Sequence, residues 1–108
     1  HNKSEPSVEI LTPSCDEIRE KRKATLVCVI QDFFPEHIEA TWKREGRDLQ
    51  EGFRTQTPVK QPDGQYATAS RLRISARQWF SGQQYTCAVF HKTTEAIREK
   101  SLTGPGTT

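Results

Sequence analysis

The chain has 108 residues, with 16 basic and 14 acidic side chains, a net charge of +2 at pH 7 and 32% hydrophobic residues. This length is enough for one domain, and the basic residues are scattered among acidic ones, which excludes a strong general attraction to nucleic acid. Its apolar runs are too short for a membrane-spanning helix. Because the hydrophobic content is below the roughly 45–50% of typical domains, a figure that also counts glycine, the core needs further support, and the three cysteines are candidates for it.

Seven segments in which apolar and polar residues alternate are predicted to form β-strands, because successive strand side chains point to opposite faces. In order along the sequence they are 7–11, 23–30, 38–43, 57–60, 66–75, 84–90 and 96–101, with weaker alternation in the first, fourth and last. Turn-forming sequences separate several of them, namely Glu45–Gly46, Pro62–Asp63–Gly64 and Ser81–Gly82. Short strands with such turns between them favour an antiparallel β-sandwich.

Two short segments are predicted to be helical instead. Ser14 followed by Glu17 is typical of a capping box before a helical turn at 18–21, and residues 75–78 fit a single turn before Trp79. The two ends, 1–6 and 102–108, are rich in polar residues, proline and glycine, as linkers between domains are. The expected domain therefore covers residues 7–101, with a linker on each side.

Two cysteines and two aromatic residues occupy inward-facing positions of the predicted strands. Cys28 and Cys87 each lie in the middle of a strand, Trp42 lies in a strand between them, and Tyr85 stands two positions before Cys87. This combination is typical of immunoglobulin sandwiches. Two isolated buried thiols are the alternative interpretation, but it leaves the spacing of the aromatic residues unexplained.

The sequence resembles the constant-type immunoglobulin domains of antigen receptors over about residues 7–101, in the segments KATLVCVIQDFFPEHIEATW, SRLRISARQW and YTCAVFH. The first segment is similar to T-cell receptor beta constant domains, whereas GFRTQTPVK and WFSGQQYTCAVFH are similar to antibody heavy and light chains. The opening PSVEILTPSC resembles the second constant domain of IgE. The long loop of mammalian T-cell receptor beta chains is missing, and the sequence ends in GPGTT and not in the cysteine of a light chain. The resemblance therefore favours a heavy chain.

This resemblance implies an all-β, seven-stranded antiparallel sandwich of the C1-set type, with Greek-key connections. It also implies one inter-sheet disulfide between Cys28 and Cys87, with Trp42 and Tyr85 packed against it in the core. A bridge that closes a loop of this size stabilises a fold by about 4 kcal/mol, which compensates for the small core. A disulfide requires an oxidising compartment, so the protein is expected to be secreted or on the extracellular face of the plasma membrane.

One outer face of the sandwich is expected to bind a partner. The outward residues of strand 38–43 are polar, whereas those of 23–30 and 66–75 include valines and alanines, and these two strands share a sheet in constant-type domains. The predicted dimer interface comprises Val27, Val29, Ala67, Ala69 and Arg71. The resemblance implies another immunoglobulin constant domain as the partner, in a homodimer of heavy chains or with a light chain. Alternatively, the outward valines reflect only the strand preference of β-branched residues.

Three further residues are candidates for specific features. Cys15, the odd cysteine, lies in a loop or first helical turn and is predicted to form an interchain disulfide, a free thiol being the alternative. Asn2–Lys3–Ser4 is a sequon, so Asn2 is a candidate N-glycosylation site. Pro35 follows two phenylalanines in a stretch that resembles antibody constant domains, which carry a cis proline there, so a cis Phe34–Pro35 bond is expected.

The sequence offers no catalytic centre. Its three histidines are far apart, it lacks CxxC and HExxH motifs, and its glycines do not form a phosphate-binding loop. No enzyme activity, cofactor or metal is therefore expected, and neither nucleic acid nor direct membrane contact. The predicted function is that of a non-catalytic structural and dimerisation module of an antibody heavy chain. The alternatives are a constant domain of a T-cell receptor beta chain or of a light chain, and a constant-like module of a histocompatibility-type receptor.

Overall fold

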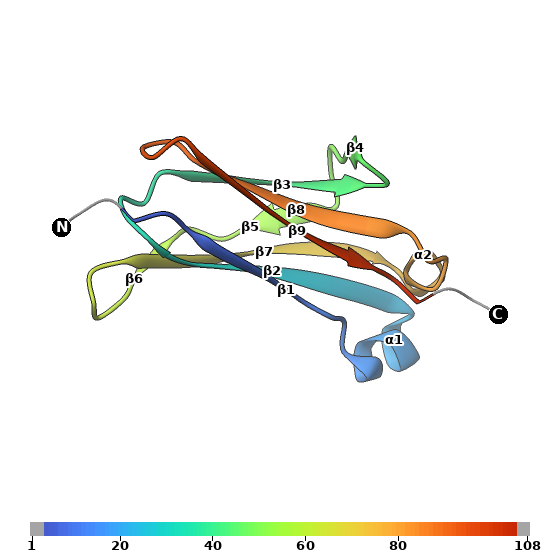
Figure 1. Cartoon of the computed structure of the whole chain (residues 1–108). Helices are drawn as coiled ribbons and strands as arrows, with labels where there is room; N and C mark the ends of the chain where they lie inside the picture. The colour runs from blue at the N-terminus through green and yellow to red at the C-terminus, as the bar shows by residue number, and fades with distance from the viewer. Residues whose placement is uncertain (1–3, 106–108) are drawn as a thin grey trace.

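The computed structural model describes residues 4–105, which form two antiparallel sheets packed face to face (Figure 1). In the first sheet the strand order is β1 (Ser7–Leu11), β2 (Lys23–Phe33), β7 (Tyr66–Ser75) and β5 (Phe53–Thr55), and β6 (Val59–Lys60) also pairs with β7. In the second sheet the order is β4 (Arg47–Asp48), β3 (Ile38–Arg44), β8 (Gln84–His91) and β9 (Ala96–Thr103). The prediction of an antiparallel β-sandwich is confirmed. Strand β1 begins at one end of the sandwich and β9 ends at the other (Figure 1).

The described residues contain nine strands, so the prediction of seven was wrong in number. Strand β4 is added by a two-residue hairpin, because Glu45 and Gly46 both adopt positive φ (52° and 80°), as a type I′ turn requires. The predicted strand at 57–60 is replaced by β5 and β6. Pro58 has no N–H to donate, and the pairing of this stretch with β7 is interrupted beside it.

The interruption beside Pro58 has the form of a bulge. The Gln56 N–H donates to the Ala69 carbonyl (3.0 Å), and Val59 is already the register partner of Ala67. Two residues, Thr57 and Pro58, therefore lie opposite one residue of β7, which bends and splits the strand.

The core lies between the sheets and consists of the inward residues of the alternating segments. In β2 the inward residues Ala24, Leu26, Cys28 and Ile30 are fully buried. They meet Trp42 from β3, Leu72 from β7 and Val89 from β8. The strand periodicity of the sequence thus decides which side chains are removed from water.

The two helices are short and lie at the same end of the sandwich (Figure 1). Helix α2 (Ala76–Trp79) carries the full capping box between Ser75 and Gln78. Helix α1 (Cys15–Lys21) begins after Ser14, whose side chain accepts from the Asp16 N–H (3.2 Å). The expected capping box with Glu17 is not formed.

Glu17 instead connects α1 to the first sheet. Its carboxylate accepts hydrogen bonds from the Thr25 N–H (2.9 Å) and from the Thr25 hydroxyl (2.6 Å). Hydrogen bonds to a carboxylate are stronger than bonds between neutral groups, so this contact holds α1 against β2.

The folded unit extends beyond the predicted limits of 7 and 101. Ser4 exchanges two backbone hydrogen bonds of 3.1 Å with Phe34, and β9 continues to Thr103. Gly104 is buried, its N–H donates to the Gln83 carbonyl (3.0 Å), and a Cβ at this position would lie 2.3 Å from the Trp79 carbonyl oxygen. That the remaining end residues connect to neighbouring domains stays a prediction.

We predict that Gly104→Ala lowers the free energy of unfolding by about 1–3 kcal/mol, because the added methyl group forces β9 away from the Trp79 backbone. Urea unfolding followed by tryptophan fluorescence measures this change. Thr103→Ala, at the exposed neighbouring position, is the control and is expected to change stability by less than about 0.5 kcal/mol. Equal stability of the two variants would contradict the contact.

Candidate protein-binding surface

The two sheets are joined at their centre by a disulfide and a hydrogen bond. The Cys28–Cys87 bridge links β2 to β8, with 6.3 Å between the Cα atoms. On β3, Trp42 is the register partner of Cys87, and on β7, Ser70 is the register partner of Cys28. The Trp42 Nε1–H donates to the Ser70 hydroxyl oxygen (3.0 Å), and all four residues are fully buried. Four central strands are thus connected across the core by two adjacent links.

Both tyrosines of the protein favour their neutral form. Burial is the main cause of a raised pKa of Tyr85; the charge of Arg44 lowers this pKa and that of Glu45 raises it. The Tyr85 hydroxyl donates to the Gln83 side chain (3.5 Å). For Tyr66, a hydrogen bond to the Glu36 side chain is the main cause of a raised pKa, followed by burial and the charge of Glu36.

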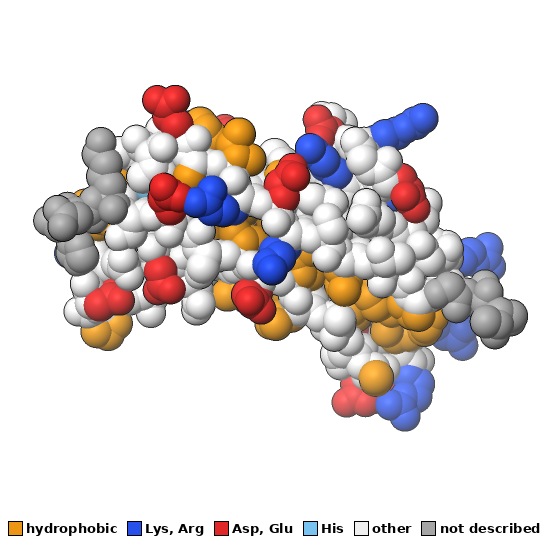
Figure 2. Space-filling model, viewed as in Figure 1, with side chains coloured by type: hydrophobic (Ala, Val, Ile, Leu, Met, Phe, Trp, Pro, Cys, Tyr) orange, Lys and Arg blue, Asp and Glu red, His pale blue; other side chains and the backbone are white. Residues whose placement is uncertain are grey.

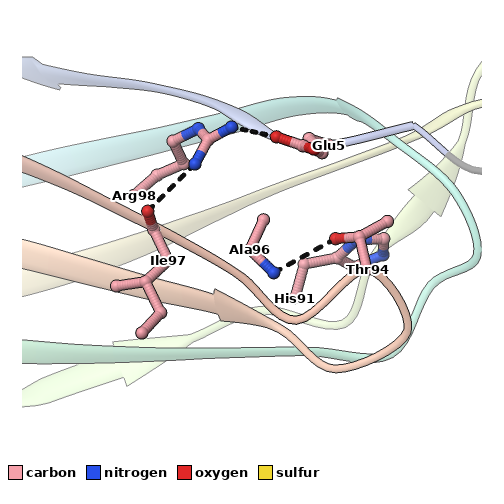
Figure 3. Close-up of polar contacts among 6 residues, drawn as sticks. All are labelled: Glu5, His91, Thr94, Ala96, Ile97 and Arg98. Atoms are coloured by element: carbon pink, nitrogen blue, oxygen red, sulfur yellow. Dashed lines mark hydrogen bonds and ion pairs between the residues drawn. The ribbon is translucent and has the colours of Figure 1, made fainter.

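The connection from β2 to β3 is held by a buried histidine. His91 is fully buried, and its Nε2 lies 2.8 Å from the Pro35 carbonyl oxygen. Because a carbonyl oxygen only accepts, Nε2 carries the proton, and in the neutral ring Nδ1 accepts from the Thr94 hydroxyl (2.8 Å). Thr94 also accepts from the Ala96 N–H (3.3 Å), at the tip of the β8–β9 hairpin (Figure 3). The Phe34–Pro35 peptide bond is cis.

The same end carries an ion pair between the segment before β1 and strand β9. Arg98 pairs with Glu5, and its guanidinium also donates to the Ile97 carbonyl (3.1 Å), as Figure 3 shows. The polar side chains at this end of the sandwich therefore stabilise the segments that connect or precede the strands. Within residues 4–105 no cluster of three His, Cys, Asp or Glu side chains is placed to hold a metal ion.

The five residues of the predicted dimer interface lie together on the outer face of the first sheet. Val27 is the register partner of Arg71, and Val29 is the register partner of Ala69. Directly opposite residues of an antiparallel pair point to the same face, and Ala67 follows on β7. The valines and alanines are partly exposed, and Arg71 is exposed.

Two apolar residues of this face were missed by the sequence analysis. Leu11 is the register partner of Val27 and is 52% exposed, and Val59 is the register partner of Ala67 and is 54% exposed. The inward positions of Val8 and Ile10 imply that Leu11 points outward, so the alternation contained that signal. Val59 had no such signal, because the bulge beside Pro58 decides its direction.

These apolar residues form a continuous stripe that steps diagonally across four strands. We call it the apolar stripe, and it comprises Leu11, Val27, Val29, Ala69, Ala67 and Val59. Side chains of this kind, rimmed by polar and charged residues, are typical of a surface that a protein partner covers.

The outer face of the second sheet mixes charged, polar and apolar side chains, and its charges form ion pairs. Lys43 pairs with Glu99 (3.3 Å), and Lys92 pairs with Glu39 (3.9 Å). Its apolar residues are Ile97, which is 64% exposed, and the partly exposed Ala88 and Phe90. Along the edge where β1 and β9 lie side by side, charges of both signs are interspersed, and apolar atoms gather near α1 and α2 (Figure 2). The first sheet differs in that its outward aliphatic residues run over four strands and none of its outward side chains forms an ion pair among the described residues.

The family model described as "Immunoglobulin C1-set domain" matches residues 8–94. The chain belongs to the immunoglobulin C1-set family. This C1-set domain is similar to two proteins from Heterodontus francisci, each described as the C region of an Ig heavy chain, with 38% identity over 99 residues and 36% over 103 residues. These alignments cover 92% and 95% of the domain but only 26% and 25% of the relatives, so the domain spans about a quarter of their length.

Solved structures of antibody domains share the fold of this C1-set domain. The "IgNAR antibody domain C3" superposes with a TM-score of 0.94 at 25% identity, covering 96% of this protein and 99% of that one. The "IgNAR antibody domain C1" superposes with a TM-score of 0.92 at 31% identity, covering 96% of each of the two. The expected resemblance to the constant domains of antibody heavy chains is therefore confirmed.

The remaining candidate residues of the C1-set domain have the following positions. Cys15 is the first residue of α1, and its thiol is free and exposed. Asn2 lies outside the described residues. No helix within residues 4–105 combines the length and apolar character needed to cross a membrane.

We predict that Ser70→Ala lowers the free energy of unfolding by about 1–3 kcal/mol, because it leaves the buried Trp42 N–H without an acceptor. Urea unfolding, followed by circular dichroism, measures the loss. Ser7→Ala removes an exposed hydroxyl whose contact with the Gln31 carbonyl is 3.5 Å, and serves as the control with an expected change below about 0.5 kcal/mol. Similar losses in both variants would show that the Trp42–Ser70 bond adds nothing.

We also predict that both tyrosines ionise above the ordinary pKa of about 10 in the folded domain. Folding favours the neutral phenol, so this contribution to stability is present below the unfolded pKa and is lost as the pH rises through the folded value. Tyrosinate absorbance measured against pH, with and without denaturant, tests the shift. Coinciding titration curves in the two conditions would contradict it.

Proposed function

We propose that this C1-set domain is a constant domain of an antibody heavy chain, with a non-catalytic role in holding two chains together and spacing neighbouring domains. The relatives that support this proposal are C regions of heavy chains and IgNAR antibody domains. The domain measures about 50 × 26 × 21 Å, and its first and last strands begin and end at opposite ends (Figure 1). That arrangement suits a spacer in a series of linked domains.

The proposed pairing surface is the outer face of the β1–β2–β7–β5 sheet, and the observation that carries it is the apolar stripe. The outward charges of the second sheet form ion pairs, and Ile97 is the large apolar residue that it leaves more than half exposed. The stripe leaves both Leu11 and Val59 more than half exposed, in one continuous series of aliphatic residues. The proposed partner is another immunoglobulin constant domain, which presents a flat sheet of similar size.

The size of the face is sufficient only if nearly all of it is used. Strands β2 and β7 pair over eight consecutive residues, from Lys23 to Ile30, which gives a length of about 25 Å and, with four strands, a width of about 20 Å. Such a face buries roughly 500 Å² per partner, near the lower limit of about 1,000 Å² in total for a specific interface. The charged residues beside the stripe must therefore take part in any pairing.

Cys15 is proposed to form a disulfide with the partner. Its thiol is exposed at the start of α1, and an unpaired cysteine in a protein that already holds one disulfide suggests a bond between chains. We further propose that the protein is secreted or extracellular, where disulfides persist, and that Asn2 is a glycosylation site.

Val27→Arg tests the pairing surface, because it places a bulky charge at the centre of the stripe. We expect it to weaken by at least about tenfold any complex of the 108-residue protein, with itself or with the constant domain of an immunoglobulin light chain, as measured by sedimentation velocity. Thr41→Arg, on the exposed outer face of the second sheet, is the matched control and should leave the complex unchanged. The proposed face is wrong if Thr41→Arg disrupts the complex and Val27→Arg does not.

A further inference from the structure

Three arginines stand beside the apolar stripe without an acidic partner. Arg71 is the register partner of both Val27 on β2 and Arg54 on β5, and Arg73 is the register partner of Thr25. All three arginines are exposed, and none forms an ion pair with a carboxylate among residues 4–105. One row across the sheet thus reads Leu11, Val27, Arg71, Arg54, half apolar and half cationic.

The arginines line a concavity that remains strongly cationic. Its volume is about 610 Å³, and Arg54, Arg71 and Arg73 line it together with Lys21 and Glu17. The single carboxylate is already engaged by the N–H and hydroxyl of Thr25. Arg71 is held in place by donating from Nη1 to the Gln56 side-chain oxygen (3.1 Å), which leaves its other N–H groups available. Guanidinium groups with free donors bind carboxylates in bidentate geometry.

The placement of Arg54 opposite Arg71 is unfavourable for the isolated domain. Like charges directly opposite in an antiparallel pair are destabilising, and an acidic residue at either of the two positions would replace the repulsion with an attraction. Positions that break a local rule of stability without a compensating contact within the fold are expected at functional sites. The missing contact is therefore to be sought in a partner.

We propose that the cationic corner formed by Arg54, Arg71 and Arg73 makes the pairing face select a different, acidic immunoglobulin constant domain over a second copy of this one. This rests on the proposed function. A two-fold pair brings the same face together twice, so a homodimer opposes two faces that each carry an excess of positive charge, whatever the direction of its axis. The acids of this face are too few to compensate, because Glu9, the register partner of Val29, is one carboxylate against three guanidinium groups, and Glu17 is engaged by Thr25.

The partner is thus a sheet that is apolar along its middle and carries Asp or Glu side chains opposite the three arginines of this domain. Because the face is barely large enough for a specific interface, the charged corner decides which partner binds. Like charges across an interface suppress the wrong partner, and opposite charges raise the association rate.

A charge-reversed copy of the same domain provides the probe. In it Arg54→Glu, Arg71→Glu and Arg73→Glu are combined, so the stripe is unchanged and the corner is acidic. Sedimentation velocity is measured for the wild-type domain alone, for the reversed copy alone and for their mixture, at low and high salt. We expect the mixture to associate at least about tenfold more tightly than either protein alone, with the advantage lost at high salt.

A second copy with the same net charge is the control. It combines Arg19→Glu, Arg47→Glu and Arg77→Glu, three arginines that lie outside the pairing face. Mixed with the wild-type domain it should show no preference. Equal association of both reversed copies with the wild-type domain would mean that overall charge, and not the corner, is responsible, and would overturn the proposal.

The outcomes separate this inference from the proposed function. If the wild-type domain alone associates as tightly as the mixture and Val27→Arg abolishes both, the pairing face stands and the selection of an acidic partner fails. If the mixture associates but Val27→Arg has no effect, or if neither sample associates, the face is not a pairing surface and the proposed function fails.

An independent readout uses the free domain. Arg54→Glu alone is expected to raise the unfolding midpoint by about 1–5 °C, because it converts the repulsion with Arg71 into an attraction. The same substitution should reduce the advantage of the mixture over the wild-type domain. A midpoint that is unchanged or lower would show that Arg54 and Arg71 do not repel each other in the isolated domain. The placement of these two arginines would then no longer indicate a missing acidic partner.

Discussion

The fold depends on the pair of links that join the two sheets at their centre. The disulfide between Cys28 and Cys87 and the hydrogen bond from Trp42 to Ser70 connect residues that are themselves register partners within each sheet. A bridge that closes such a loop contributes about 4 kcal/mol, which is large beside a net stability of about 5–15 kcal/mol. Among the described residues no buried side-chain nitrogen or oxygen lacks a hydrogen-bond partner, so the polar atoms brought inside do not offset this gain.

Because these links join the sheets from the inside, the outward side chains are not needed to hold the two sheets together. The outward charges of the second sheet form ion pairs, one between β3 and β9 and one between β3 and the turn after β8, and paired charges of this kind are stable in water. The first sheet presents the apolar stripe and the cationic corner, which a single domain has no reason to retain. The function that we propose follows from this difference between the faces, and the antibody domains among its structural relatives support it.

The first sheet separates the residues that stabilise the fold from those of the proposed cationic corner. Strands β2 and β7 are fixed by their inward residues, such as Leu26 and Leu72, which are buried. Their outward residues are therefore free to vary without loss of the core. Opposed arginines such as Arg54 and Arg71 are expected to lower the stability of the free domain slightly, and that small cost is compatible with a fold that its disulfide already secures.

Which side of each strand is buried follows from the local sequence alone, because side chains alternate along any extended strand. On that basis the sequence predicted the inward Cys28, Trp42 and Tyr85 and the outward Val27 and Ala69, and the resemblance to constant domains supplied the disulfide. Which residues of different strands become neighbours depends instead on how the strands pair in three dimensions. Register and strand order arise from hydrogen bonds between segments far apart in the sequence, and a local pattern does not contain them. The bulge at Pro58 therefore placed Val59 on the stripe without a sequence signal, and the pairing of β5 with β7 brought Arg54 beside Arg71. Glu17 likewise fitted a capping box in the sequence, but the packing of α1 on β2 offered it Thr25, with two hydrogen bonds in place of one.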